Sequence, residues 1–282
     1  MALIWLSVAG ALAGFAANSL LTRAAVGRHL IDPITFTEVR LATGALTLLA
    51  LQRLRGGSAD GRFLDGLIGA AALGVYAFAF AFGYTRIDAG NGALILFGGV
   101  QLTMLTWSVV SGERSGAMQW GGLATAVAGL VVLTQPGATA PDHRGAALMA
   151  CAGAAWGIYT LRGRGAGDPL ARTAASFLWA AIAGVAIVAL MAHGVALTGK
   201  GVALASISGA IASGVCYTLW YVALPSLTAF RASLLQLTVP VLTALAAVPL
   251  LGERISIRLV CASALVLGGI GVAALAKARP HR

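Results

Sequence analysis

Long apolar blocks separated by short polar breaks run along the whole chain. An α-helix needs about 20 apolar residues to cross the hydrocarbon core of a bilayer, and the blocks have this length. Pro, Gly and charged clusters between the blocks mark where one helix ends and the next begins. The pattern predicts ten membrane-spanning helices, at 3–22, 33–52, 63–84, 90–111, 117–134, 145–162, 169–192, 201–223, 228–250 and 256–276.

The composition supports a membrane protein. Of the 282 residues, 59% are hydrophobic and 10% are charged, and the mean hydropathy is +0.89. A soluble domain carries about a quarter charged residues, so this chain has too little polar surface to cover a globule. The first apolar block has no basic region before it, and we expect it to be retained as a span rather than cleaved as a signal peptide.

The net charge of +10 comes from basic residues in the short loops between the blocks. Such charges orient a chain in a membrane, and their placement does not fit a nucleic-acid surface. With ten spans both termini lie on one side, which carries ten Lys and Arg residues against seven on the other side. The sequence therefore predicts that both termini are cytoplasmic.

An internal repeat relates the two halves of the chain. Residues 111–133 and 251–273 align at a shift of 140, and the triplet Gly-Glu-Arg at 112–114 recurs at 252–254. The pair Asp-Pro at 32–33 is echoed at 168–169. Since each half, 1–135 and 136–282, holds five spans, the second half must enter the membrane inverted. Inverted repeats are typical of secondary transporters, whose substrate site lies near mid-bilayer between the halves.

Two five-span halves, each with Gly-Glu-Arg between its fourth and fifth span, resemble the drug/metabolite transporter superfamily of the EamA type. The resemblance covers nearly the whole chain. Within the superfamily, the chain is similar to the YddG group of bacterial exporters of aromatic and other neutral amino acids. The resemblance implies the bacterial inner membrane and a basket of spans one, three, four, six, eight and nine around a central cavity. Spans five and ten would pack at the periphery.

The repeat brings two helix-weakening features to matching positions. The stretch "LILFGGVQL" (94–102) aligns with "LLQLTVPVL" (234–242), so that Gly98 and Gly99 align just before Pro240. Proline kinks a helix because it removes one backbone hydrogen bond. The family typically has a second proline at the position of Val100, and this chain departs from that pattern. Close helix packing would explain either glycine alone, whereas the paired disruption favours a cavity wall.

Buried amides form a second group of candidates. Gln101 and Gln236 are the only glutamines well inside predicted spans, and Asn18 lies inside the first span. The repeat counterpart of Asn18, with a one-residue slip, is Tyr159. An amide in hydrocarbon needs a partner; an interhelical hydrogen bond and contact with a substrate explain these residues equally well.

Aromatic residues form a third group. Tyr76, Phe80 and Tyr84 lie at i, i+4 and i+8 on one helix face, and the repeat aligns Phe80 with Trp220. Aromatic rings near span ends form interface belts, which we expect for Tyr84. Deeper rings suit a cavity wall for an apolar or aromatic neutral solute. The predicted wall residues are Phe15, Tyr76, Phe80, Trp156, Tyr217 and Trp220.

Other chemistry has little support in the sequence. Glu38 is the only acid inside a span and lies near its start, beside Arg40. A proton relay or cation site would need a carboxylate near mid-bilayer, so we do not expect coupling through a buried glutamate. Uniport, or coupling through other groups that the sequence does not identify, stays open. The cysteines are far apart, and the histidines lie in loops, at a span end or in the tail. We therefore expect no enzyme activity, metal or cofactor.

The sequence thus predicts a monomeric secondary transporter that exports small neutral metabolites by alternating access. Amino acids, including aromatic ones, are the favoured substrates, and the partners would be this solute and membrane lipid. Two alternatives stay open. One is an exporter of a nucleoside or sugar derivative, and the other is a membrane scaffold in which the glycines and glutamines serve packing alone.

Overall fold

The described part of the chain is all-helical. A computed structural model describes residues 2–56, 63–111, 116–137, 139–162, 168–191, 196–223, 226–227 and 235–277. Within these ranges the only β pairing is an isolated bridge between Ile31 and Leu197. The helices are α1 (Ala2–Val26), α2 (Pro33–Leu54), α3 (Phe63–Tyr84), α4 (Ala89–Val110), α5 (Ala117–Thr134), α6 (His143–Arg162), α7 (Pro169–Met191), α8 (Gly199–Ile207), the π-helix η1 (Ser208–Val215), α9 (Cys216–Ala223), α11 (Thr238–Leu251) and α12 (Ile257–Lys277).

Seven helical stretches of the described residues are long and apolar enough to cross a membrane. They are Leu3–Val26, Pro33–Leu54, Gly66–Tyr84, Ala89–Trp107, Ala117–Thr134, Pro169–Met191 and Gly199–Trp220. Thr238–Leu251 and Ile257–Ala273 are shorter apolar helices. The prediction of a multi-pass, all-α membrane protein is confirmed. Each predicted segment overlaps a helix, although 228–234 and the first Gly-Glu-Arg triplet at 112–114 lie outside the described residues.

The two Asp-Pro pairs begin two helices in the same way. Asp32 Oδ1 accepts the backbone N–H groups of Ile34 and Thr35 at 3.0 and 2.9 Å at the start of α2. Asp168 Oδ1 accepts the N–H of Leu170 at 2.9 Å at the start of α7. An aspartate cap accepts hydrogen bonds from backbone amides that have no partner within the helix. Proline is tolerated at the first helical position, where an N–H would have no partner within the helix. The repeated dipeptide is therefore a repeated helix start.

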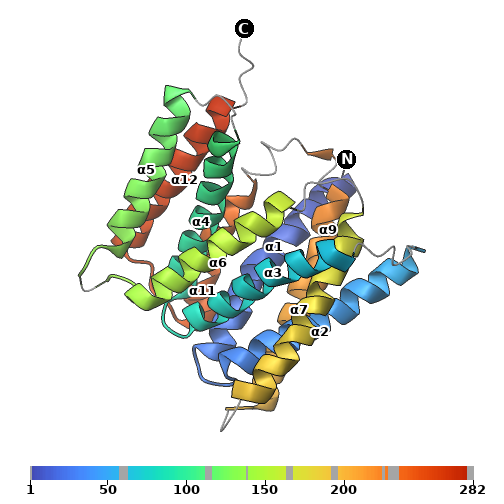
Figure 1. Cartoon of the computed structure of the whole chain (residues 1–282). Helices are drawn as coiled ribbons and strands as arrows, with labels where there is room; N and C mark the ends of the chain where they lie inside the picture. Colours follow the sequence, from blue (N-terminus) through green and yellow to red (C-terminus); the bar gives the residue numbers. More distant parts are fainter. Residues whose placement is uncertain are drawn as a thin grey trace.

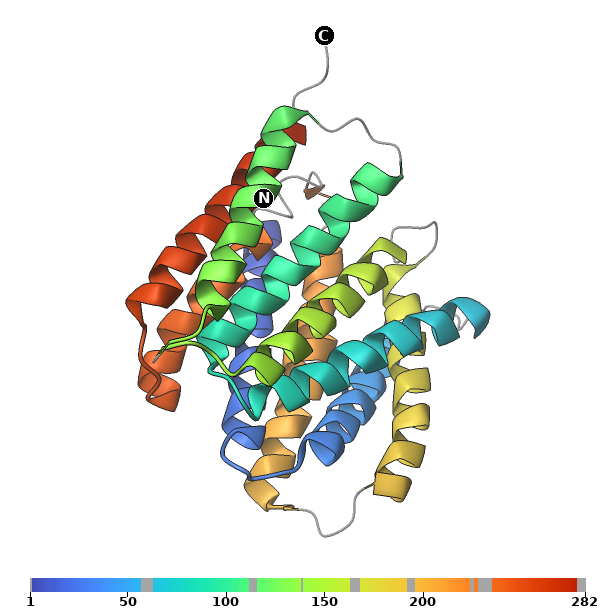
Figure 2. The same ribbon diagram turned by 60° about the vertical axis from the view of Figure 1, so that its left-hand side comes forward.

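The helices pack in pairs around a common core, seen from two directions in Figures 1 and 2. In the core, α3 contacts α6 and α1 contacts α9, while α4 contacts α6 and α1 contacts α11. The helices α2 and α7 contact each other on one side. The pair α5 and α12 lies at the opposite edge of the bundle (Figure 1), where α4 is its main neighbour. This pair packs closely at Gly269, which has no Cβ. A Cβ at this position would lie only 2.6 Å from the backbone nitrogen of Ala126.

The bundle has two distinct ends. The start of α1 and the end of α12 lie at the same end (Figure 1), which we call the terminal end. The connections α1–α2, α3–α4 and α11–α12 lie at the other end, which we call the distal end (Figure 2).

Two predicted helices differ from simple α-helices. The segment predicted at 201–223 contains the π-helical turns of η1 at its centre. In the segment predicted at 228–250, helical residues 235–236 are followed by a turn at Leu237 before α11 begins at Thr238. Leu237 keeps right-handed dihedrals, with φ −66° and ψ −15°, and Pro240 lies within α11, so the predicted kink at Pro240 stays a prediction. By contrast, α4 continues through Gly98 and Gly99 without interruption.

Candidate functional site

A pocket lies about midway along the core helices. Its walls come from α1, α3, α4, α6 and α9 together with the residues before α11. The lining residues are Phe15, Asn18, Ser19, Tyr76, Phe80, Leu96, Phe97, Trp156, Tyr217 and Gln236. The cavity is small, about 20 Å³, which is the room for one or two water molecules. A larger solute therefore requires the walls to move apart.

Seven of the residues predicted from the sequence line this pocket. They are Phe15, Asn18, Tyr76, Phe80, Trp156, Tyr217 and Gln236. These residues come from distant parts of the chain, from Phe15 in α1 to Gln236 just before α11. The structure thus brings most of the predicted set together in one place.

The aromatic wall is a continuous network of ring contacts. Trp156 lies at the centre, with ring centroids 4.8 Å from Tyr76, 5.4 Å from Tyr217 and 5.2 Å from Tyr159. Phe15 continues the wall from Tyr217, at 5.6 Å. Aromatic pairs at 4.5–7 Å attract each other beyond simple burial. The wall offers flat apolar surfaces and π-faces to anything that enters the pocket.

A chain of polar groups crosses behind this wall. Asn18 donates from Nδ2 to the hydroxyl oxygen of Tyr76 at 3.3 Å, and its Oδ1 accepts from Ser208 Oγ at 2.7 Å. Arg40 of α2 donates from Nη2 to the same Tyr76 oxygen at 3.2 Å and from Nε to Ser213 Oγ at 3.3 Å. The side chains of Asn18, Ser208, Ser213 and Arg40 are all buried. The π-helix η1 supplies both serines, in line with the frequent placement of π-helical turns at functional sites.

Six predicted residues lie away from the lining. Gly99 packs against α6, where a Cβ would lie 3.4 Å from Cα of Gly153, and Gly98 faces α5 and α12. Gln101 is buried in α4. Tyr159 contacts Thr173 of α7 at 3.3 Å, and Trp220 packs behind Phe15 at 5.9 Å. Pro240 is buried in the first turn of α11.

The sequence reasoning missed several residues of the site. Ser19, Leu96 and Phe97 line the pocket, and Arg40 lies directly behind it. One signal was available for Arg40, because an arginine within a membrane span is rare and faces protein or a cavity rather than lipid. Glu38, two residues earlier, lies on another helix face against Gly184 of α7.

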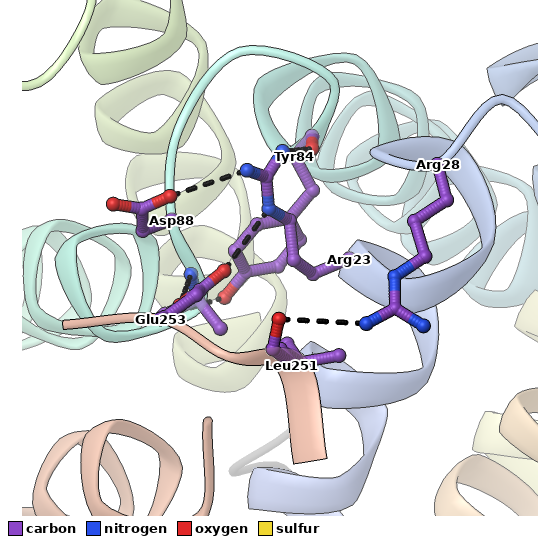
Figure 3. Close-up of polar contacts among 7 residues, drawn as sticks. Arg23, Arg28, Tyr84, Asp88, Leu251 and Glu253 are labelled. Atoms are coloured by element: carbon purple, nitrogen blue, oxygen red, sulfur yellow. Dashed lines mark hydrogen bonds and ion pairs between the residues drawn. The ribbon is translucent and has the colours of Figure 1, made fainter. Parts of the chain in front are cut away.

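A cluster of charged residues lies at the distal end (Figure 3). Arg23 at the end of α1 donates to Asp88 Oδ1 at 3.2 Å, to Glu253 Oε1 at 3.1 Å and to the carbonyl oxygen of Tyr84 at 2.9 Å. The other oxygen of Glu253 accepts the backbone N–H of Ala89, the first residue of α4, at 2.8 Å. We call Arg23, Asp88 and Glu253 the distal cluster. It joins α1, the α3–α4 connection and the α11–α12 connection.

The second Gly-Glu-Arg triplet acquires a structural meaning here. Gly252 ends α11 with φ of 73°, a left-handed conformation that favours glycine. The turn places Glu253 toward α1 and α4. Burial, followed by the nearby Asp88 carboxylate, raises the pKa of Glu253 above its ordinary value of 4.5. The Glu253 carboxyl is therefore easier to protonate in this arrangement than in water.

The candidate site offers binding surfaces rather than reactive groups. The pocket lining carries hydroxyl, amide and aromatic groups, with no acidic or basic side chain among its described residues. Within the described part of the chain, no three His, Cys, Asp or Glu side chains come together as metal ligands do. Such a lining can hold a small solute by ring contacts and a few hydrogen bonds.

Comparisons with known proteins find a family model, a relative in sequence and a solved structure of similar fold. The model described as the EamA-like transporter family matches residues 143–275. "Uncharacterized protein PA1977" of Pseudomonas aeruginosa is 50% identical over 263 residues, 93% of this chain and 91% of that protein. A solved structure described as "Crystal structure of protein" is similar over 98% of this chain and 99% of its own, with a TM-score of 0.71. Its sequence is 20% identical, so this likeness concerns the fold alone.

Proposed function

Because the chain belongs to the EamA-like transporter family, we propose that it is a secondary transporter that exports small neutral metabolites. Amino acids, including aromatic ones, are the favoured substrates, as in the YddG group. The observation that carries this proposal is the mid-bundle pocket, in which aromatic faces surround a few hydrogen-bonding groups. We place the solute among Phe15, Asn18, Tyr76, Trp156 and Gln236.

The proposed architecture is ten spans in two inverted halves, 1–135 and 136–282. The helix contacts support it, because each contact has a counterpart when every helix is replaced by the equivalent helix of the other half. The contact of α3 with α6 corresponds to that of α9 with α1, and α4 with α6 corresponds to α11 with α1. The pairs α2–α7 and α5–α12 correspond to themselves. In such folds the pocket between the halves is the transport site.

We propose alternating access as the mechanism. The distal cluster ties α1 to the α3–α4 and α11–α12 connections, so in this arrangement it closes the pocket from the distal side. Opening that side requires the ion pairs to separate. With both termini in the cytoplasm of a bacterium, the distal end would face outward from the inner membrane, and release would follow opening of the cluster. A monomer contains the whole pocket, and we propose that it suffices.

Counterflow in proteoliposomes tests the proposed function. Vesicles loaded with one unlabelled solute are diluted into the labelled solute, with panels of amino acids, nucleosides and sugars. We expect accumulation of label for neutral amino acids, and we expect it without an imposed pH gradient. Counterflow only with nucleosides or sugars would support an exporter of those derivatives, and no counterflow with any solute would support a scaffold. A strict need for a pH gradient would exclude uniport.

A further inference from the structure

Arg40 is a charged side chain fully buried inside a membrane-spanning helix. Its exposed fraction is 1%. Among the described residues, no carboxylate lies within ion-pair distance of its guanidinium. Its polar neighbours are Tyr76, Ser213 and Tyr217, none of which carries a negative charge at neutral pH. The pocket region therefore contains a positive charge that the surrounding described residues do not balance.

The geometry of Arg40 holds this charge directly behind the pocket wall. The guanidinium carbon lies 5.2 Å from the ring centroid of Tyr76 and 5.3 Å from that of Phe80, and both rings line the pocket. Two of its donors are used by Tyr76 and Ser213, while Nη1 makes no hydrogen bond within the described residues. Burying such a charge and leaving a donor unused opposes folding, so a static packing role is a poor explanation for it.

The hydroxyl of Tyr76 connects this charge with the pocket. Its oxygen accepts from Arg40 Nη2 and from Asn18 Nδ2, which uses the two acceptor positions of a hydroxyl. The hydroxyl hydrogen is what Tyr76 can then offer to a solute. A donor polarised by a neighbouring cation prefers a negatively charged acceptor, because charge-assisted hydrogen bonds are about twice as strong as neutral ones.

We infer that Arg40, acting through the hydroxyl of Tyr76, makes the pocket select solutes that carry a carboxylate. The inference rests on the proposed function and narrows its substrate class, because sugars and nucleosides lack this group. The carboxylate lies at Tyr76 and the remainder of the solute packs against the aromatic wall. The α-ammonium group, on the carbon next to the carboxylate, meets the neighbouring ring faces and Gln236. An amine without a carboxylate finds the same positive charge and no acidic partner in the described lining.

Matched solutes test the inference in the counterflow assay. Phenylalanine, leucine and alanine are each compared with the corresponding carboxamide, with the decarboxylated amine and with the N-acetyl derivative. The N-acetyl derivative keeps the carboxylate and loses the ammonium group. It therefore separates the effect of the carboxylate from the effect of the solute's net charge. We expect the amino acid to compete about 10- to 100-fold better than its amide or amine, the range of one hydrogen bond to a charged group. The N-acetyl derivative is expected to compete better than the amide.

Variants then assign the preference to residues. Tyr76→Phe removes only the hydroxyl, and Arg40→Gln removes the charge; each is expected to bring the acid-to-amide ratio close to one. Arg40→Lys keeps the charge and should retain part of the preference, which a purely structural role would not produce. Tyr84→Phe is the matched control on the same helix face, and it should leave the ratio unchanged. If Arg40→Gln fails to fold, Tyr76→Phe alone decides.

The outcomes separate the two proposals. Counterflow of amino acids with a ratio near one in the wild type, or a ratio unchanged in Tyr76→Phe, would overturn the carboxylate inference and leave the transporter proposal standing. Counterflow of none of the solutes, acids and amides alike, would count against the proposed function itself.

Discussion

Arg23 at the end of α1 donates from Nε to Oε1 of Glu253 over 3.1 Å, joining two regions that are 230 residues apart. The same carboxylate accepts the first backbone N–H of α4 through its other oxygen. Glu253 therefore satisfies one of the unpaired amides of a helix start and pairs with a cation at once. One side chain thus joins the α11–α12 connection to α1 and α4 at the distal end.

The first prediction concerns the strength of this contact. A double-mutant cycle with Arg23→Gln and Glu253→Gln should give a coupling energy of about 1–3 kcal/mol in thermal unfolding in detergent, as expected for a partly buried charged hydrogen bond. The matched control is the exposed pair Arg86–Asp142, 3.8 Å apart, which should give a coupling of about 0–1 kcal/mol. Equal couplings in the two cycles would show that the distal cluster is an ordinary surface contact.

The second prediction concerns pH. Because the pKa of Glu253 is raised in the distal cluster, that arrangement binds a proton more tightly than an exposed glutamate does. The contribution of Glu253 protonation to the stability of the distal cluster is therefore fully present below the ordinary pKa of 4.5. It is lost as the pH rises through the raised pKa. Hydrogen exchange at the amide of Ala89, corrected for its intrinsic pH dependence, should show falling protection over this range. Glu253→Gln should flatten the profile, and protection that increases with pH would contradict the expected direction.

The third prediction separates two glycines that face each other. A Cβ at Gly153 would lie 2.5 Å from the carbonyl oxygen of Leu96, whereas a Cβ at Gly99 meets ordinary contacts from 3.4 Å outward. Gly153→Ala should therefore destabilise the protein by about 1–3 kcal/mol through overpacking of α4 against α6. Gly99→Ala should be tolerated in both thermal stability and counterflow. Loss of counterflow in a stable Gly99→Ala protein would restore a direct role for this glycine.

The fourth prediction concerns the cost of the buried charge. Arg40→Met keeps much of the side-chain volume and removes a charge that has no acidic partner among its described neighbours. Replacing buried charged groups by apolar ones is often neutral or stabilising by about 1–4 kcal/mol. We expect an unchanged or higher melting temperature together with loss of the carboxylate preference. A drop of several degrees in a variant that keeps the preference would mean that Arg40 serves the fold.

Much of the fold could be predicted because its signals are local. Apolar block length gave the helices, and the Asp-Pro pairs marked two helix starts through a cap whose partners lie two and three residues away. The aromatic wall was also accessible, because Tyr76 and Phe80 share one helix face and the repeat related Phe80 to the helix that carries Tyr217. Regular spacing carries this information without knowledge of the packing.

The remaining features depend on packing that spacing does not encode. The π-helical turns of η1 place Ser208 and Ser213 beside α1 and α2. The apolar pattern of this segment predicts a regular α-helix and gives no sign of the π-helical turns. The glycine pair at 98–99 has the same local signature whether it bends a helix or lets a neighbour approach. At Gly99 the role is close approach of a neighbouring helix, and only the position of Gly153 on α6 shows this.

The fifth prediction concerns the pocket between α1, α3, α6 and α9, where we place the transported solute. Ser19 lines this pocket and is 1% exposed, so a thiol introduced there reports on the pocket whenever the walls open. In a chain with Cys151→Ser and Cys261→Ser, Ser19→Cys should react with a small thiol reagent in proteoliposomes, and the same chain with Ser19 retained gives the background of Cys216. We predict that a solute active in counterflow slows the labelling of Ser19→Cys in proportion to its occupancy. An unchanged labelling rate at saturating concentrations of a transported solute would contradict the claim.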